Sequence, residues 1–223
     1  MGKLVLVPTP IGNLDDITIR ALQVLKSCDV ILAEDTRVTK RLLSHFNILK
    51  PIKSYHINNE HKVLDKFLQE IQKNNLTVLV SDAGTPGISD PGFLIVRSCI
   101  EQEIKVEVLP GPTAFVPALV GSGLPCDSFI FEGFLPHKKG RHKALEKLSK
   151  ESRTLVLYES PHRLVKLLEQ MIIYFEPNRR ICVVRELTKV YETYNHGTLE
   201  ELRRFYTEAD VKGEIVVIVE GIK

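Results

Sequence analysis

In the stretch "LTVLVSDAGTPGISDPG", residues 76–92, an apolar strand runs directly into a loop rich in glycine, proline and aspartate. Its first part, "LTVLVS" (76–81), is a continuous aliphatic and β-branched run of the kind that forms a buried strand. The loop that follows places three glycines and two prolines in twelve residues. A loop this irregular at the end of a buried strand is typical of a segment that contacts a ligand.

Strands and amphipathic helices alternate on both sides of this stretch in the first half of the chain. Unbroken Val, Ile and Leu runs separated by helices predict parallel pairing in a sheet that is covered on both faces. Asp90 and Pro91 have the N-cap and first-turn preferences that start a helix, which we expect to run through Glu101. The other expected strands are residues 3–8, 29–34 and 105–110, and the other expected helices are residues 16–27, 36–46 and 60–74.

The second half resumes the alternation after residues 110–123. The segment "VYETYNHGTL" (190–199) alternates with period two, which predicts an antiparallel hairpin or edge strand. We therefore predict an α/β fold of two α/β/α domains with mostly parallel sheets, over residues 1–114 and 115–223. The expected strands of this half are residues 128–134, 154–159, 180–187 and 213–221, and the expected helices are residues 139–150 and 160–171.

The composition is that of an ordinary soluble globular protein, with 43% hydrophobic and 26% charged residues. A net charge of +2 is too small to argue for a nucleic-acid partner, so any basic surface must be local. The cysteines (28, 99, 126 and 182) have no zinc or redox spacing, and the histidines show no metal spacing. No signal peptide precedes Lys3 and no apolar run reaches membrane-spanning length, so we expect a cytoplasmic protein with reduced thiols.

Three loops just beyond strand ends are candidates for ligand contact: residues 8–16, 81–92 and 110–114. In open α/β sheets, ligands bind outside the carboxyl ends of the strands, and glycine there lets backbone amides approach the ligand. The alternative is that each loop is only a tight turn between a strand and a helix.

The usual nucleotide motifs are missing from these loops. The chain has no G-x-x-x-x-G-K-[ST] motif, and the first strand-to-helix turn, "PTPIGN", lacks the G-x-G-x-x-G pattern of dinucleotide folds. The absence of these motifs favours a nucleotide-like ligand that has no polyphosphate. S-adenosylmethionine is such a ligand, and it suits a site of backbone amides and carboxylates. Asp82 is placed to accept from its ammonium or ribose, or alternatively to cap its own turn.

Six segments together resemble the motifs of a known family. They are "LVLVPTPIGNLDDIT", "AEDTR", "SDAGTPGISDPG", "LPGPTA", "YESPHR" and "KGEIVV", in this order from about residue 4 to residue 220. The chain resembles the ribosomal RNA small subunit methyltransferase I family, a branch of the tetrapyrrole methylase superfamily. The forms "PTPIGN" and "SDAGTP" point away from porphyrin substrates and towards the rRNA branch.

The resemblance implies a class III methyltransferase architecture with S-adenosylmethionine in a cleft between two α/β domains, and a homodimer. It implies 2′-O-methylation of a cytidine ribose in 16S rRNA, near the decoding region of the small ribosomal subunit. The cofactor-binding residues that it implies are Pro8, Asp82, Ala83, Gly84, Thr85, Thr113 and Ala114 in the first half, and Tyr158, Glu159, Leu187 and Thr188 in the second.

The chemistry needs little from the protein beyond alignment and help with a proton. A sulfonium carries a good leaving group, and a ribose hydroxyl is a weak acid that a nearby base or cation helps to ionise. Glu186 and Lys189, at a strand end and its turn, are the hypothetical catalytic pair. The alternative is a solvated charged edge.

RNA binding requires local basic surfaces, because phosphate contacts supply affinity. The helical spacing of Arg37, Lys40 and Arg41 places them on one face, and Lys138, Lys139, Arg141 and Lys143 cluster at a loop and helix start. Either run could be merely a solvated face. Two other functions stay open: a small-molecule (tetrapyrrole-type) methyltransferase, and a non-catalytic factor of ribosome assembly.

Overall fold

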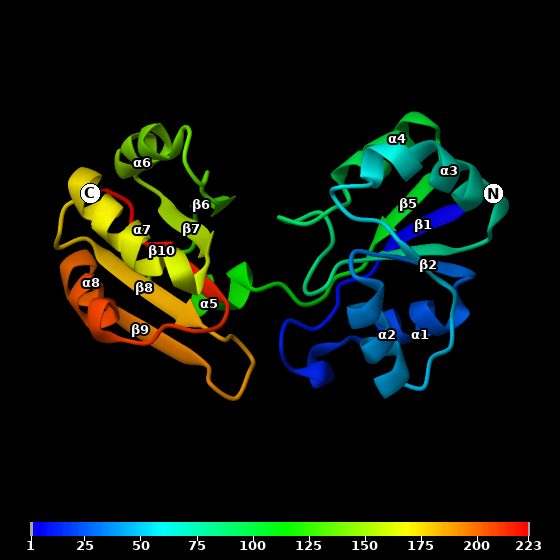
Figure 1. The fold of residues 1–223 in the computed structure, drawn as a ribbon, viewed down its shortest axis with the longest axis horizontal. Coiled ribbons are helices and arrows are strands. Elements are labelled where there is room, and N and C mark those ends of the chain that lie inside the picture. Colours follow the sequence, from blue (N-terminus) through cyan, green and yellow to red (C-terminus); the bar gives the residue numbers. More distant parts are fainter. Residues whose placement is uncertain (1, 223) are drawn as a thin grey trace. The chain divides into compact units, whose positions relative to one another are not determined.

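The computed structural model describes residues 2–222, which form two compact units (Figure 1). The N-terminal unit extends to Thr113 and the C-terminal unit begins at Ala114. This division lies one residue before the expected one. Among residues 2–222, no helix combines the length and apolar content that crossing a membrane requires.

The N-terminal unit contains a five-stranded sheet in the order β3-β2-β4-β1-β5, and every strand pair in it is parallel. The central strands are completely buried, which explains their unbroken aliphatic sequences. The mostly parallel sheet predicted for this half is confirmed. The strands are β1 (Lys3–Leu6), β2 (Val30–Ala33), β3 (Ile52–Ser54), β4 (Thr77–Val80) and β5 (Lys105–Val108).

Helices cover both faces of this sheet (Figure 1). Helices α1 (Ile19–Ser27) and α2 (Thr36–His45) pack on one face, and α3 (Glu60–Lys73) and α4 (Phe93–Glu101) on the other. The neighbouring strands β1 and β4 therefore send their connections to opposite faces. Such a switch point opens a crevice at the carboxyl ends of the strands, which is where α/β sheets bind ligands.

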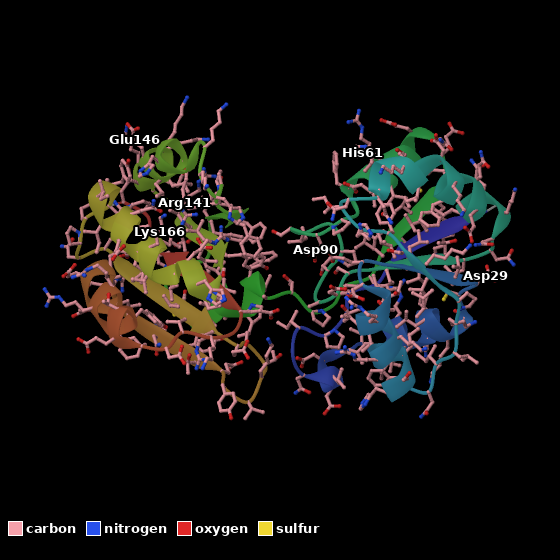
Figure 2. The ribbon with its side chains drawn as sticks, in the orientation of Figure 1. Asp29, His61, Asp90, Arg141, Glu146 and Lys166 are labelled. Carbon is pink, nitrogen blue, oxygen red and sulfur yellow. The ribbon has the colours of Figure 1, made fainter. Side chains whose placement is uncertain are left out.

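The expected start of α4 is wrong by two residues. Gly92, not Asp90, is the N-cap residue, and the helix begins at Phe93. Ser89 adopts a left-handed conformation with φ 63°, so the loop continues through Pro91 before the chain turns into the helix. Asp90 is thus part of the long loop after β4 (Figure 2).

The C-terminal unit contains a second five-stranded sheet in the order β6-β7-β10-β8-β9. Only β6 and β7 pair in parallel, whereas β10 pairs antiparallel with β7 and β8, and β8 pairs antiparallel with β9. The expectation of a mostly parallel sheet is wrong here, although the expected hairpin at β9 is confirmed. The strands are β6 (Phe129–Phe134), β7 (Thr154–Glu159), β8 (Arg180–Arg185), β9 (Thr193–Thr198) and β10 (Ile215–Val219).

The two faces of the second sheet are covered unequally. Helices α6 (Arg141–Ser149), α7 (Pro161–Tyr174) and α8 (Leu199–Glu208) share one apolar core with one face. The short helix α5 (Phe115–Gly121) lies on the other face, where the rings of Phe115 and Phe131 pack with their centroids 4.8 Å apart. The carboxyl ends of β7 and β8 come together at one edge, because Ile215 at the start of β10 pairs with both Glu159 and Arg185.

Candidate functional site

Three loops meet at the carboxyl edge of the N-terminal sheet. Thr9 and Gly84 form an isolated antiparallel bridge, and the Thr9 hydroxyl donates to the Ser81 carbonyl at 3.2 Å. The Thr85 hydroxyl donates to the Pro112 carbonyl at 3.1 Å. These bonds join residues 8–16, 81–92 and 110–113 into one structure, which we call the loop rim.

The backbones in the loop rim approach each other closely. Gly84 has φ +75°, a left-handed conformation that side chains other than glycine rarely adopt, and a Cβ on it would lie 3.5 Å from Ile11. A Cβ on Gly111 would lie 2.7 Å from the Cβ of Pro8, which is too close without a backbone shift. The rim therefore depends on bare backbone, as its sequence indicated.

Carboxylates gather beside the rim at the ends of β2 and β4. The Asp35 amide donates to Asp82 Oδ1 at 2.9 Å, and Asp35 also caps α2 through the Arg37 amide. Burial, reinforced by the charge of Asp82, raises the pKa of Glu34. The hydrogen bonds from Arg37 hold the pKa of Asp35 well below its usual range. This edge is negatively charged and suits a cation.

The predicted cofactor residues of the N-terminal unit all belong to the rim. Pro8 and Gly84 are buried, Asp82 is exposed, and Ala83 and Thr85 are half-buried. Thr113 ends the N-terminal unit, and Ala114 is the N-cap of α5 at the start of the other.

The predicted cofactor residues of the C-terminal unit lie at the carboxyl ends of β7 and β8. The half-buried ring of Tyr158 packs against Phe131 and Phe134, with centroids at 5.2 and 5.5 Å. Leu187 is buried, and Thr188 has a left-handed φ of 64° while its amide donates to the Glu192 carboxylate.

Glu186 and Lys189 form a close ion pair in this turn. Lys189 Nζ lies 2.8 Å from Glu186 Oε1 and 3.0 Å from Glu214 Oε2, and the Glu214 amide also donates to Glu186 at 2.9 Å. The bond from Lys189 lowers the pKa of Glu186. Burial opposes the charge on Lys189, but its two carboxylate partners outweigh burial and raise its pKa. Both groups are therefore charged at neutral pH, so the pair offers an ammonium and a weakened base.

The structure changes the roles of Arg141 and Glu159. Both are only 3% exposed, and Arg141 Nη2 donates to Glu159 Oε2 at 2.9 Å. Arg163 Nη2 and the Ser160 amide occupy Glu159 Oε1 at 2.7 and 2.9 Å. The structure does not place Arg141 where the predicted RNA contact needs it, because its guanidinium is buried. Glu159 likewise has both oxygens engaged with partners of its own unit.

The other predicted RNA-binding residues are exposed. Arg37, Lys40 and Arg41 lie on the exposed side of α2, opposite the buried Thr39 and Leu43. Arg37 is also paired with Asp35 at 2.6 Å. Of the predicted basic cluster around α6, Lys138, Lys139 and Lys143 are exposed.

Glu34 and Arg163 are site residues that were not predicted. Two signals in the sequence point to them. Glu34 ends an apolar strand directly before Asp35, and Arg163 follows Glu159 by four residues at the start of a helix. The contact of His137 with Arg163 Nη1, at 2.8 Å, has no sequence signal. Within residues 2–222, no cluster of three or more His, Cys, Asp or Glu side chains is arranged to hold a metal ion.

Solved structures share this architecture. The uroporphyrin-III C-methyltransferase of Thermus thermophilus, in complex with S-adenosyl homocysteine, aligns with a TM-score of 0.69 at 22% identity, covering 98% of this chain and 97% of that one. A cobalt precorrin-4 methyltransferase of cobalamin biosynthesis aligns with a TM-score of 0.73 at 17% identity, covering 98% and 94%. The fold is thus that of the class III tetrapyrrole methyltransferases.

The family follows from the sequence itself. The model of the tetrapyrrole (corrin/porphyrin) methylases matches residues 3–203, and the chain belongs to this family. A protein of Halalkalibacterium halodurans named ribosomal RNA small subunit methyltransferase I is 49% identical over 99% of this chain and 76% of its own length. A Thermotoga maritima protein of the same name is 43% identical over 99% of both chains.

Proposed function

We propose that this protein transfers a methyl group from S-adenosylmethionine to the ribose 2′-oxygen of a cytidine in 16S rRNA, near the decoding region. The observation that carries the proposal is the near full-length similarity to relatives named ribosomal RNA small subunit methyltransferase I. The sequence resemblance supports the cytidine, the 2′-oxygen and the decoding region as the finer parts of the proposal.

The loop rim fits the proposed cofactor. S-adenosylmethionine carries positive charge at its sulfonium and ammonium groups, and it supplies an electrophilic methyl carbon when bound. The carboxylates of Glu34 and Asp82, beside the Asp35–Arg37 ion pair, give the rim edge a negative charge that favours such a ligand. Gly84 and its neighbours let main-chain groups reach an adenosyl moiety without an intervening Cβ. We assign the adenosyl and amino-acid contacts to this rim. The sequence resemblance supports Tyr158, Leu187, Thr188 and Ala114 as further cofactor contacts.

Lys189 is the stronger member of the proposed catalytic pair. Its raised pKa keeps it cationic, so it can stabilise the negative charge that develops on a ribose oxygen as the oxygen loses its proton. Glu186 accepts from Lys189 and from the Glu214 amide, and it thereby holds the ammonium in place. Its lowered pKa makes it a weak proton acceptor, so we propose a supporting role for Glu186.

The acceptor RNA is proposed to contact the exposed basic residues of α2 and of the segment before α6. Phosphate contacts of this kind give affinity that weakens with salt. A homodimer in the cytoplasm completes the proposal, and sedimentation of the purified chain tests the dimer.

Labelled methyl transfer tests the proposed activity against its alternatives. The purified protein is incubated with labelled S-adenosylmethionine and, separately, assembled small ribosomal subunits, naked rRNA and tetrapyrroles. Transfer to either RNA substrate supports the proposal and identifies the preferred form. Transfer only to a tetrapyrrole would assign a small-molecule methyltransferase, and binding without any transfer would assign an assembly factor.

A further inference from the structure

A buried ion cluster lies beneath the basic segment 136–141 of the C-terminal unit. Its centre is the Glu159 carboxylate at the end of β7, which is held by Arg141 at 2.9 Å and by Arg163 at 2.7 Å. The Arg141 side chain is 4% exposed and that of Glu159 is 1% exposed. Removing an ionic group from water is costly, so a cluster this well buried calls for an explanation.

The cluster fixes the basic segment at both of its ends. At the first end, Arg141 Nη1 donates to the Pro136 carbonyl at 3.3 Å, and Arg163 Nη1 lies 2.8 Å from His137 Nδ1. At the second end, Arg141 itself is tied to Glu159, and its Nε donates to Gln170 Oε1 at 2.7 Å. A single carboxylate thus organises both ends of one short turn.

The residues between the two ends are the exposed lysines. Lys138 and Lys139 lie in this turn, and the Arg141 amide donates to the Lys138 carbonyl at 3.3 Å. Neither lysine has a carboxylate partner among the ion pairs of residues 2–222. Two cations are therefore presented on a backbone that the buried cluster holds in shape.

We propose that Glu159 and Arg141 are positioning residues for RNA binding, which hold the turn so that Lys138 and Lys139 meet phosphates of the substrate. The inference rests on the proposed function, and it gives the buried pair a role without contact with cofactor or RNA. A phosphate-binding turn of fixed shape loses less freedom on binding than a flexible one, and so binds more tightly.

The direction in which Glu159→Gln changes RNA affinity distinguishes a positioning role from a purely electrostatic one. Glu159→Gln removes a negative charge, so electrostatics alone predicts that the protein binds RNA more tightly. Positioning predicts weaker binding, because the turn loses its shape. Arg141→Lys keeps the charge but loses the forked contacts to Gln170 and Pro136, so it should also weaken binding.

A double-mutant cycle tests the coupling, with the dissociation constant of small-subunit rRNA fragments measured over a range of salt concentrations. We expect Lys138→Ala/Lys139→Ala to weaken binding about tenfold and to make the salt slope shallower by about two. Arg141→Lys and Glu159→Gln should each give a similar loss. Either one combined with the lysine changes should be little worse than the lysine changes alone, because interacting residues do not add.

Arg179→Lys is the matched control. Arg179 is 6% exposed, donates to the Ser149 carbonyl at 3.1 Å and lies over Phe175, away from the basic turn. The Arg179→Lys substitution changes another buried guanidinium of the same unit. RNA binding by this variant should stay within about twofold of wild type. Circular dichroism selects variants that are folded, and amide exchange of residues 137–141 should be faster in Arg141→Lys but not in Arg179→Lys.

Three results would overturn the inference. Additive losses in the cycle, tighter binding by Glu159→Gln, or wild-type affinity in a folded Arg141→Lys protein would each show that the cluster does not position the turn. Methyl transfer to RNA by the wild-type protein would then still support the proposed function. A wild-type protein that neither binds RNA nor methylates it would overturn both proposals together.

Discussion

Thr9 and Gly84 exchange two backbone hydrogen bonds, each amide donating to the other carbonyl at 2.9 Å. The bridge joins the loop after β1 to the loop after β4, the two loops that flank the switch point of the N-terminal sheet. It fixes the rim before any ligand arrives, and the left-handed Gly84 makes its geometry possible.

Gly84→Ala should therefore weaken the binding of S-adenosylmethionine. Alanine at a positive φ costs about 1 kcal/mol of stability, and the strain would distort the bridge with Thr9. We expect a tenfold or larger rise in the dissociation constant, roughly 1.4 kcal/mol or more, measured by calorimetry with the cofactor and its demethylated product.

Gly123→Ala is the control for this substitution. Gly123 also has a positive φ, of +64°, and a Cβ on it would meet nothing within 4 Å. It should lose a similar free energy of unfolding and keep cofactor affinity. Equal cofactor affinities for the two variants would argue against the loop rim as the binding site.

Glu34→Gln should separate stability from binding. The raised pKa of Glu34 means that its ionised form is disfavoured by burial and by Asp82, and this cost is present once the pH rises above its folded pKa. The variant should thus be slightly more stable than wild type at neutral pH, but bind the cationic cofactor more weakly by about 1 kcal/mol. Thermal unfolding and calorimetry at pH 7 measure the two effects, and unchanged affinity would remove Glu34 from the site.

Lys189→Met should slow methyl transfer strongly in single-turnover experiments. Loss of one charge-stabilising group from an active site typically reduces the rate about 100-fold. Glu186→Gln should have a smaller effect, about tenfold, because the carboxylate only holds the ammonium. Lys150→Met is the control, since Lys150 forms an exposed pair with Glu146 at 3.7 Å. If both Glu186→Gln and Lys189→Met transfer methyl groups at the wild-type rate, the pair has no catalytic role and is only a local structural contact.

The same pair gives a pH dependence of stability with a defined sign. Glu186 has a lowered folded pKa, so its contribution is present above its unfolded value of 4.5 and is lost as pH falls through the folded pKa. Lys189 has a raised folded pKa, so its contribution is present below 10.5 and is lost as pH rises through the folded value. Urea unfolding should find Glu186→Gln less stable than wild type by about 1 kcal/mol from pH 6 to 9, with the difference shrinking below pH 4.5. A difference that grows in acid would contradict this assignment.

Lys40→Gln and Arg41→Gln should weaken RNA binding about uniformly across sequences. Each removes one exposed cation from α2, so each should make the salt slope shallower by about one if the residue contacts a phosphate. Lys73→Gln, on the exposed end of α3, is the control and should leave the slope unchanged. If both α2 variants show the salt slope of wild type, Lys40 and Arg41 do not contact RNA phosphates.

The strand and helix pattern of the N-terminal unit was predictable because each element follows a local rule. Thr18 and Asp35 cap α1 and α2 through their side chains, and the buried strands are continuous aliphatic runs. The second sheet was harder, because β10 is an equally apolar run. Burial on both faces makes a central antiparallel strand look like a parallel one in sequence.

The partners of charged residues were less predictable, because they come from distant parts of the chain. In the sequence, Arg141 is one of several basic residues at the start of a helix, and nothing in this basic run distinguishes it from its neighbours. Its spacing to Leu145 and Leu148 nonetheless places it on the buried face of α6. Every second residue of a strand lies on the same face of the sheet, so Glu159 shares a face with Leu155 and Leu157. The contact between them depends on how α6 packs against the sheet, which local patterns do not encode.

The proposed activity is tested most directly by mapping ribose methylation in rRNA. Small subunits from cells that lack the protein are incubated with S-adenosylmethionine and the purified chain, and their rRNA is digested with alkali. The proposal predicts a single new alkali-resistant dinucleotide that contains 2′-O-methylcytidine, located near the decoding region. A methyl group on a base, or rRNA that remains fully sensitive to alkali, would contradict it.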